Sequence, residues 1–463
     1  MFYKDLDKYG DNVALITENR NISYTELQNE IDKFKKILSG KAVAFNLCQN
    51  NEESVIGYIG FLQAGIVQIL INPSIDRELY DNLYQTYQPK YIWGESKETE
   101  NSLYTYQNYS LKITEYTEDV SVNHDLALLL TTSGSTGSPK LVRQSFANIS
   151  SNAASIAEYL NIKGEDRPIT TLPMNYTYGL SIINSHLLKG AGIILTQYTL
   201  TQREFWKLLA EKEATTFGGV PYTYEILKRI HFLNKDYPSI KYLTQAGGKL
   251  GKELHYEFAS KCNAKGINFI VMYGQTEATA RMSYVPSDYS VEKAGSIGIA
   301  IPNGKLSLID ENGKEITETE LVGELIYEGE NVTLGYALCK EDLNKGDENN
   351  GRLFTGDMAM RDKDGYYYIV GRKKRFLKLF GNRVNLDEVE GLLKKENVEC
   401  VCSGVDDCLK IYIMDQSKED LVKKFILNRT AIPRQGFKIY VIDNIPRNDS
   451  GKILYNVLES LYE

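Results

Sequence analysis

Short apolar runs alternate with helical patterns along most of the chain, and this alternation restricts the fold more than any other feature. Apolar runs of four to seven residues predict buried strands, and helical periodicity predicts helices between them. The predicted strands cover residues 42–47, 67–71, 127–130, 192–195 and 269–272, and the predicted helices cover 24–38, 53–62, 149–159 and 202–211. Such alternation is typical of parallel sheets covered by helices. The sequence therefore predicts a layered α/β fold.

The most apolar stretch of the sequence, residues 54–71, does not predict a transmembrane helix. Gln63, Gln68 and three glycines interrupt it, whereas a bilayer requires about 20 predominantly apolar residues. We expect a buried helix that runs into a buried strand, and no membrane span. The first ten residues lack the apolar region of a secretory signal. The expected location is the cytoplasm.

After residue 293 the pattern changes to short strands separated by Asn-Gly, Asp-Gly and Gly-Glu turns, which predicts a β-rich subdomain built from hairpins. A basic run at 372–378 follows the last of these strands. The remaining chain, about 90 residues, predicts a small α+β domain. Its predicted elements are helices at 386–396 and 418–428, a hairpin across 405–407 and a strand at 437–443. We therefore expect domains at 1–371 and 372–463.

The composition excludes some classes of function. Lys and Arg total 53 against 61 Asp and Glu, a net charge of −8, so the chain lacks the positive field that non-specific nucleic-acid binding requires. Only four histidines accompany 33 tyrosines, which leaves few candidates for an imidazole base or metal ligand. The six cysteines are too sparse for a disulfide framework and do not provide a four-ligand zinc set. We expect buried free thiols.

The strongest local signal is a buried strand at 126–130 followed by the loop TTSGSTGSPK at 131–140. Glycines allow the backbone to approach a ligand closely, and the hydroxyls, backbone N–H groups and Lys140 can all donate to a polyanion. Phosphate is the natural ligand. A flexible Ser/Gly linker is the alternative, but a linker does not normally follow so apolar a strand directly. The spacing is not that of a Walker P-loop.

This loop resembles the signature loop of the adenylate-forming superfamily, which includes acyl-CoA synthetases, adenylation domains of peptide synthetases and luciferase-like enzymes. Six further segments resemble that superfamily in the same order along essentially the whole chain. They are QAGGKL at 245–250, VMYGQTEAT at 271–279, GELIYEGENVTLGY at 323–336, FTGDMAMRDKDGYYYIVGRKKR at 354–375, GNRVNLDEVE at 381–390 and IPRNDSGKI at 445–453.

The resemblance implies a binding site for ATP. Tyr273 would lie against adenine, Thr276 near phosphate and Glu277 on Mg²⁺, a hard cation that takes carboxylate oxygen. Asp357 would accept hydrogen bonds from both ribose hydroxyls, and Arg372 would be a second ribose and phosphate contact. The other implied nucleotide-binding residues are Thr132, Ser133, Gly134, Ser135, Thr136, Gly137 and Lys140 of the loop, Ala246, Gly247 and Gly248 of the adenine-pocket wall, and Gly274.

The small domain would supply the catalytic lysine. Lys452 resembles the family's lysine that stabilises charge at the α-phosphorus and on the entering carboxylate. Lys374, two residues after Arg372, occupies the position of the family's hinge residue. Relatives rotate the small, mobile domain about that residue between adenylation and thioester formation.

The resemblance also implies an acyl pocket lined by Tyr176, Tyr178, Gly179 and Gly219. Gly218, Tyr222 and Gly274, with Arg281 nearby, would complete it. Thr177 occupies the position that holds Asp in amino-acid-activating relatives. Since a buried α-ammonium without a partner is costly, we do not expect an α-amino acid. The lining favours a small or medium, partly polar acid over a long lipid.

The implied reaction is attack of a carboxylate on the α-phosphorus of Mg-ATP, which gives an acyl-adenylate and pyrophosphate. A carboxylic acid titrates near ~4, so the nucleophile is already ionised and needs no general base. A thiol then takes the acyl group, which makes the expected enzyme an acyl- or aryl-CoA ligase. One alternative is a stand-alone ligase that loads a phosphopantetheinyl carrier protein. Another is a catalytically silent nucleotide-binding protein, which Glu277 and Lys452 together argue against.

Overall fold

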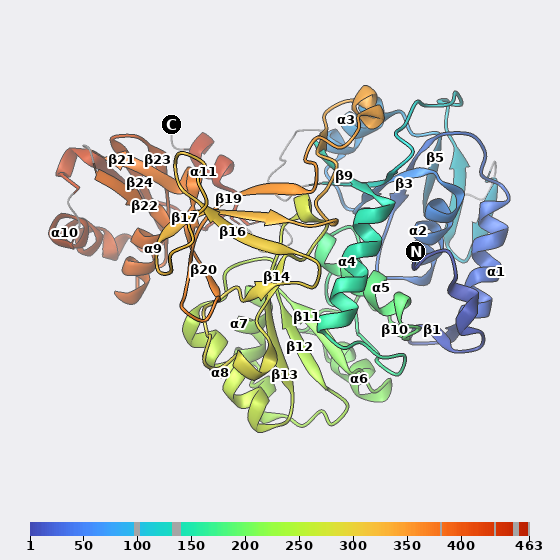
Figure 1. Cartoon of the computed structure of the whole chain (residues 1–463), viewed down its shortest axis with the longest axis horizontal. Helices are drawn as coiled ribbons and strands as arrows, with labels where there is room; N and C mark the ends of the chain where they lie inside the picture. Colours follow the sequence, from blue (N-terminus) through green and yellow to red (C-terminus); the bar gives the residue numbers. More distant parts are fainter. Residues whose placement is uncertain (97–101, 132–139, 380–381, 430–431, 448–452, 462–463) are drawn as a thin grey trace. The chain divides into compact units, whose positions relative to one another are not determined.

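The computed structural model describes residues 1–96, 102–131, 140–379, 382–429, 432–447 and 453–461 (Figure 1). By its internal contacts the chain divides into two compact units. Unit 1 comprises residues 1–306 and 327–353, and unit 2 comprises 307–326 and 354–463. The expected domain boundary at 371/372 lies within unit 2 and stays a prediction.

The largest sheet of unit 1 has eight strands and contains three of the predicted ones. Its order is β18 (Tyr336–Ala337), β9 (Leu141–Ser145), β8 (Leu126–Thr131), β4 (Val67–Ile71), β3 (Val43–Leu47), β5 (Tyr91–Glu95), β7 (Tyr109–Ile113) and β6 (Tyr104–Tyr106). The pairs β8–β4, β4–β3 and β3–β5 are parallel, and the outer pairs are antiparallel. The predicted parallel α/β core is thus confirmed.

The apolar stretch at 54–71 forms the expected buried helix followed by a buried strand. Helix α2 (Glu52–Ala64) ends at Gly65, whose left-handed φ of 70° suits a residue without Cβ. Strand β4 then begins at Val67, and all five of its residues are buried. Across the described residues, no helix is long and apolar enough to cross a membrane.

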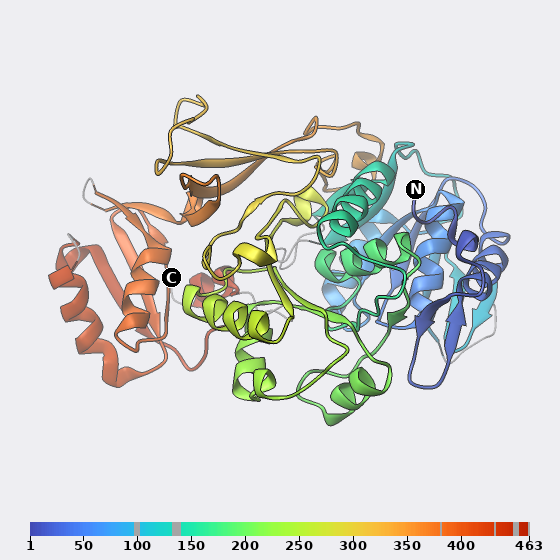
Figure 2. The same cartoon turned by 60° about the horizontal axis from the view of Figure 1, so that its bottom comes forward.

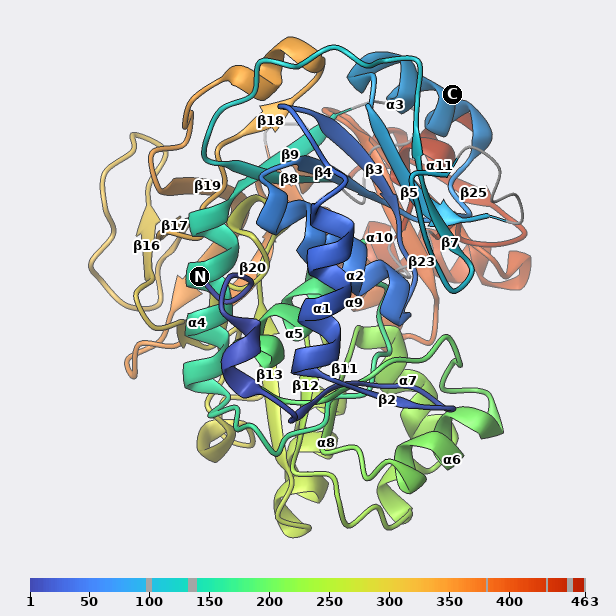
Figure 3. The ribbon, with the colours of Figure 1, turned by 90° about the vertical axis from the view of Figure 1, so that its right-hand side faces the viewer.

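Helices cover both faces of this sheet. Helices α1 (Tyr24–Lys35) and α2 lie side by side on one face (Figure 3), where Ile31 and Ile56 share a core with Leu128. Helix α3 (Arg77–Tyr87) covers the other face, where Leu83 packs with Phe45. Burial of each such side chain contributes roughly 1.5–3 kcal/mol.

A second sheet of unit 1 positions the candidate site. Its order is β11 (Thr216–Gly219), β12 (Tyr242–Gln245), β13 (Asn268–Tyr273), β14 (Ser283–Tyr284) and β15 (Ile299–Ala300), of which the first three are parallel. The helices around it are α4 (Phe146–Tyr159), α5 (Thr177–Leu188), α6 (Arg203–Glu211), α7 (Pro221–Arg229) and α8 (Lys252–Ala264). Helix α5 contributes Leu180 to the core of the large sheet and Tyr178 to the core of this one. It therefore joins the two layers.

Among the described residues up to 372, two smaller sheets are also present. Strands β10 (Ile193–Ile194), β1 (Val13–Ile16) and β2 (Asn21–Ser23) form one. Strands β16 (Lys305–Ile309), β17 (Val322–Glu328), β19 (Arg352–Arg361) and β20 (Tyr367–Arg372) form the other. The last two make an antiparallel hairpin whose turn contains Gly365 at φ 87°. The predicted β-rich block after residue 293 is confirmed.

The C-terminal part of unit 2 has the predicted α+β organisation (Figure 2, orange to red). Its elements are β21 (Phe376–Leu379), β22 (Asn382–Asn385), α9 (Leu386–Lys395), β23 (Cys400–Val405), β24 (Cys408–Ile413), α10 (Glu419–Arg429), β25 (Phe437–Val441) and α11 (Tyr455–Leu461). Helices α9 and α10 pack on one face of the β23–β24–β25 sheet, and Leu458 of α11 packs on the other. Val405 pairs with Cys408 across the predicted turn.

All six cysteines are free thiols, three of them buried as expected. Cys48, Cys262 and Cys402 are buried, and the other three are partly exposed. Burial raises the pKa of Cys48 to about 12 and that of Cys262 to about 12. Both thiols therefore stay protonated and unreactive at neutral pH.

We expect the folded protein to lose stability in mild acid, because two of its histidines are buried. Burial lowers the pKa of His186 to about 4 and that of His255 to about 4. Below about pH 6.5 these two histidines are protonated in the unfolded chain, whereas in the folded chain they stay neutral until about pH 4. The free energy of unfolding therefore decreases as the pH falls through this range. We expect a loss of roughly 2 kcal/mol per histidine between pH 7 and pH 5. Urea unfolding at the two pH values measures it.

His124 provides the matched control for this prediction, because its side chain is 89% exposed. His124→Gln should leave the pH dependence unchanged, whereas His186→Asn should make it shallower. An equally steep loss of stability in His186→Asn and in the parent protein would contradict the assignment.

Candidate functional site

The predicted metal-binding carboxylate, Glu277, lies just beyond strand β13 in a single 3-10 turn, Thr276–Ala278. Its Oε1 accepts a hydrogen bond from the Tyr336 hydroxyl at 2.8 Å, and its backbone carbonyl accepts one from Thr333 N at 3.0 Å. The carboxylate is half-buried. A carboxylate has about four lone-pair positions, so this arrangement orients the group and leaves it able to bind a cation.

Tyr336 also contacts the lysine of the Ser/Thr/Gly loop. Lys140 Nζ lies 3.6 Å from the centroid of the Tyr336 ring, a cation–π contact. Burial, with the adjacent Glu277 carboxylate, raises the pKa of Tyr336 above its ordinary value, so the hydroxyl remains a neutral donor. Sequence reasoning gave this tyrosine no role. Its position in the GELIYEGENVTLGY segment was the available signal.

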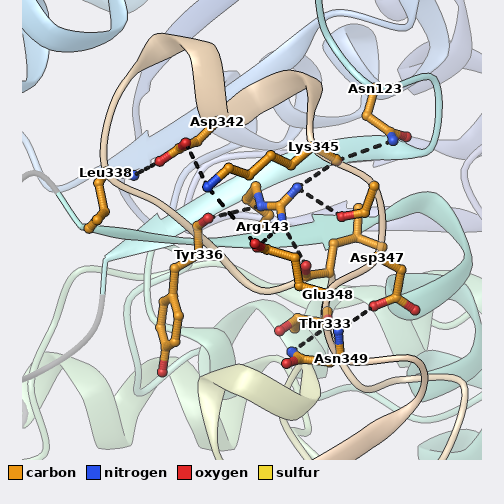
Figure 4. A network of polar contacts seen from close by, with 12 residues as sticks. Asn123, Arg143, Thr333, Tyr336, Leu338, Asp342, Lys345, Asp347, Glu348 and Asn349 are labelled. Atoms are coloured by element: carbon orange, nitrogen blue, oxygen red, sulfur yellow. Dashed lines mark hydrogen bonds and ion pairs between the residues drawn. The ribbon is translucent and has the colours of Figure 1, made fainter.

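A buried arginine fixes the segment that carries Tyr336 (Figure 4). Arg143 on β9 is fully buried. Its guanidinium donates to the carbonyls of Leu334 at 2.6 Å and Tyr336 at 3.0 Å, and pairs with Glu348 at 2.5 Å. It also donates to the carbonyls of Lys345 and Gly346. The position of Tyr336 is therefore determined by a network that the motifs do not include.

Asn331 organises the loop that follows Glu277. Its Nδ2 donates to the carbonyls of Ala278 at 2.8 Å and Arg281 at 2.9 Å, and its Oδ1 accepts from the Tyr327 hydroxyl at 2.7 Å. Asn331 is 4% exposed. Since the loop has little regular structure, these bonds replace the backbone pairing that a helix or strand would provide.

The turn predicted to form the adenine wall follows strand β12 directly. Gln245 is fully buried, and its Nε2 donates to the carbonyls of Ala246 at 3.2 Å and Gly248 at 3.1 Å. Gly247 has φ 83°, and a Cβ there would collide with the Tyr176 hydroxyl. The predicted adenine wall and the predicted acyl-pocket tyrosine are thus brought together.

Three of the four residues first named for the acyl pocket pack around the base of this turn. Tyr176 and Tyr178 belong to one apolar cluster with Ala246 and Met272. The Tyr178 hydroxyl lies 2.9 Å from Thr244 Oγ1. Gly219 ends strand β11 and pairs in register with Gln245.

Most of the other residues predicted in or beside the acyl pocket are held by close contacts within the protein. Gly179 lies against the carbonyls of Leu172 and Pro173, which leave no room for a Cβ. The Thr177 hydroxyl donates to the Thr279 carbonyl at 2.7 Å. The Tyr222 side chain is 52% exposed. Gly274 faces the Ala280 carbonyl closely, which explains why the residue after Tyr273 has no side chain.

In unit 2, the two residues predicted to contact ribose pair with each other. Asp357 on β19 and Arg372 on β20 are register partners, and Arg372 Nε lies 3.3 Å from Asp357 Oδ1. The Asp357 side chain is 6% exposed and that of Arg372 is 66% exposed. The carboxylate is therefore held in place by its neighbouring strand.

The predicted hinge is followed at once by a firmly bound arginine. The side chain of Lys374 lies outside the described residues. Arg375 pairs with Asp387 at 2.6 Å and Glu390 at 2.6 Å, and its guanidinium lies 4.4 Å from the Tyr455 ring centroid. The chain is thus attached to helix α9 from residue 375 onward.

The phosphate loop and the catalytic lysine fall outside the described residues. Thr132, Ser133, Gly134, Ser135, Thr136 and Gly137 belong to the segment 132–139, and Lys452 belongs to 448–452. Thr131 pairs with Leu141, and Arg447 pairs with Ile453, so the described residues on either side of each segment are adjacent.

Comparison with known proteins places these features in a family. The family model described as AMP-binding enzyme matches residues 2–337. The 2-succinylbenzoate–CoA ligase of Bacillus licheniformis is 30% identical over 72% of this chain and 70% of that ligase. The 2-succinylbenzoate–CoA ligase of Bacillus subtilis is 26% identical over 97% of this chain and 95% of that ligase.

The fold is also similar to that of a solved ligase. The structure of O-succinylbenzoate coenzyme A synthetase from Bacillus subtilis, in complex with AMP, aligns with a TM-score of 0.80 at 23% identity. The alignment covers 99% of this chain and 98% of that structure. This chain therefore shares its layered fold, with the C-terminal α+β part, with that ligase structure.

Proposed function

The chain belongs to the AMP-binding enzyme family, and we propose that it activates a carboxylic acid with ATP as an acyl-adenylate and transfers the acyl group to coenzyme A. The observation that carries this proposal is Glu277, oriented by Tyr336 beside Lys140, in a chain matched by the family over residues 2–337. The curated relatives described above are CoA ligases, which favours coenzyme A over a carrier protein as acceptor.

The residues around Glu277 fit a magnesium ion. Mg²⁺ is usually bound by one or two carboxylates together with substrate phosphates, and Glu277 provides one oriented, half-exposed carboxylate. When bound, the ion would neutralise charge on the phosphates of ATP. Lys140 would add a second positive charge, which Tyr336 holds within reach of the same region.

The remaining roles follow the family resemblance. Tyr273 and the turn at Ala246–Gly248 would hold adenine, and Asp357 with Arg372 would hold ribose. Lys452 would stabilise charge at the α-phosphorus, and Lys374 would be the hinge of the small domain. Because the attacking carboxylate is ionised at neutral pH, this chemistry depends on positioning and charge neutralisation. No histidine base is needed.

We place the enzyme in the cytoplasm. Its six free cysteines fit a reducing compartment.

The decisive experiment incubates the protein with ATP, Mg²⁺ and a library of carboxylic acids, with and without coenzyme A. We expect acid-dependent pyrophosphate release and, with coenzyme A, an acyl-CoA product identified by its mass. A parallel incubation with phosphopantetheinylated carrier proteins tests the other acceptor. Thioester formation on a carrier protein, with none on coenzyme A, would contradict the assigned acceptor.

A further inference from the structure

Arg281 is a buried cation that lacks a counter-ion among the described residues. It is 3% exposed, and its guanidinium carbon lies 3.8 Å from the centroid of the Tyr178 ring. No described Asp or Glu forms an ion pair with it, and its Nε has no hydrogen-bond partner. A guanidinium stays charged in proteins, and burying an unpaired charge is strongly unfavourable.

Two other arginines of the described residues, the fully buried Arg143 and the partly buried Arg375, have carboxylate partners. Arg143 is fully buried and pairs with Glu348. Arg375, whose side chain is 13% exposed, pairs with Asp387 and Glu390. Arg281 therefore differs from these two arginines, whose guanidinium groups pair with carboxylates.

Arg281 lines a small cavity whose other polar side chains are already engaged. The cavity lies under strands β11 and β12 beside helix α5. His186 on its wall contacts the Ile182 carbonyl and the Tyr242 hydroxyl through its two ring nitrogens. The Ser181 hydroxyl donates to the Tyr178 carbonyl. Thr244 Oγ1 lies within hydrogen-bond distance of the Tyr178 hydroxyl. Among the lining residues, Arg281 has a buried side-chain nitrogen, Nε, that makes no hydrogen bond.

The cavity borders residues of the predicted acyl pocket, because Gly218 and Arg281 line it and Tyr178 stacks on Arg281. Gly218 and Thr244 are register partners and both line the cavity, each one residue before its strand ends. The turn at Ala246–Gly248 begins at that strand end. Arg281 lies four residues after Glu277 on the same loop. An acid whose reacting carboxylate is near Glu277 would thus extend its far end toward Arg281.

We propose that Arg281 binds a second anionic group, a carboxylate or sulfonate, at the far end of the acid that is activated. This inference rests on the proposed acid activation and narrows its substrate class. Arg281 would be the specificity-determining residue, since charge-assisted bonds to a guanidinium discriminate strongly between a charged group and a methyl group. The Tyr178 ring would hold the guanidinium plane in position.

The test uses acid pairs that differ by one carboxylate: butanoate with butanedioate, hexanoate with hexanedioate, and benzoate with benzene-1,3-dicarboxylate. The parent protein should release pyrophosphate with a kcat/KM about 10- to 100-fold higher for the best diacid than for its monoacid. Arg281→Gln should lose that preference by slowing the diacid alone, and Arg281→Lys should keep part of it. A parent protein that prefers the monoacids would overturn the proposal. So would an Arg281→Gln variant that slows both members of a pair equally.

Thermal stability with and without the acids separates this inference from the proposed function. The preferred diacid should raise the melting temperature of the parent protein and not that of Arg281→Gln, without ATP. If the diacid stabilises the parent protein but no acid causes pyrophosphate release, the proposed function is contradicted and the anion site is not. If pyrophosphate is released equally with diacids and monoacids, the anion site is contradicted and the proposed function is not. Should Arg281→Gln not fold, the parent protein and Arg281→Lys decide the question.

Discussion

Lys452→Ala should abolish acid-dependent pyrophosphate release while largely sparing thioester formation from supplied acyl-adenylate. The ammonium group is proposed to stabilise negative charge that develops at the α-phosphorus, and removal of one such donor commonly lowers the rate by about 100- to 1,000-fold. The second step attacks a carbonyl and makes no such charge at phosphorus. Pyrophosphate release and acyl-CoA formation from the adenylate, measured separately, give the two rates.

Lys438 offers a matched control, because it is an exposed lysine on strand β25 of the same unit. Lys438→Ala should leave both half-reactions at the rate of the parent protein. Undiminished pyrophosphate release in Lys452→Ala would refute the role of Lys452. Equal loss of both half-reactions would indicate damage to the small domain instead.

The layered core could be predicted because continuous apolarity reports burial on both faces. Residues 67–71 are apolar apart from Gln68, and they form a fully buried central strand. The ends of the helices could be predicted less accurately. Helix α4 begins at Phe146, three residues before the predicted start, because Ser145 and Asn148 form a capping box. Helix α1 ends at Lys35 rather than 38, since residues 36–38 continue only as turns.

The contacts that orient the site could not be predicted from motifs. Tyr336 and Glu277 are 59 residues apart, and no periodicity indicates that their side chains meet. Their contact depends on Arg143, which the β9–β18 pairing brings to the carbonyls of 334–336. The burial of Arg281 could not be predicted from the sequence either. Arginine side chains are mostly exposed in folded proteins. The burial of Arg281 is evident only from the packing of Tyr178 and of the loop after Glu277.

Glu277→Gln should lower pyrophosphate release about 100-fold and raise the Mg²⁺ concentration needed for half-maximal rate. The amide has the size of the carboxylate and can still accept the Tyr336 hydrogen bond, so the change removes charge with little effect on packing. A hard divalent cation binds neutral amide oxygen much less well than carboxylate. Magnesium titrations of the rate, with calorimetric binding of ATP in Mg²⁺ and in EDTA, measure both effects.

Tyr336→Phe separates the charge of Glu277 from its orientation. This variant keeps the ring that contacts Lys140 and loses only the 2.8 Å hydrogen bond. A hydrogen bond to a charged group contributes about 1.5–3 kcal/mol, but rotation of the side chain can recover part of that loss. We therefore expect a reduction of about 10-fold, with a smaller shift in Mg²⁺ dependence than in Glu277→Gln. An unchanged magnesium requirement in Glu277→Gln would exclude Glu277 as the metal ligand, and Tyr336 would then only support the loop.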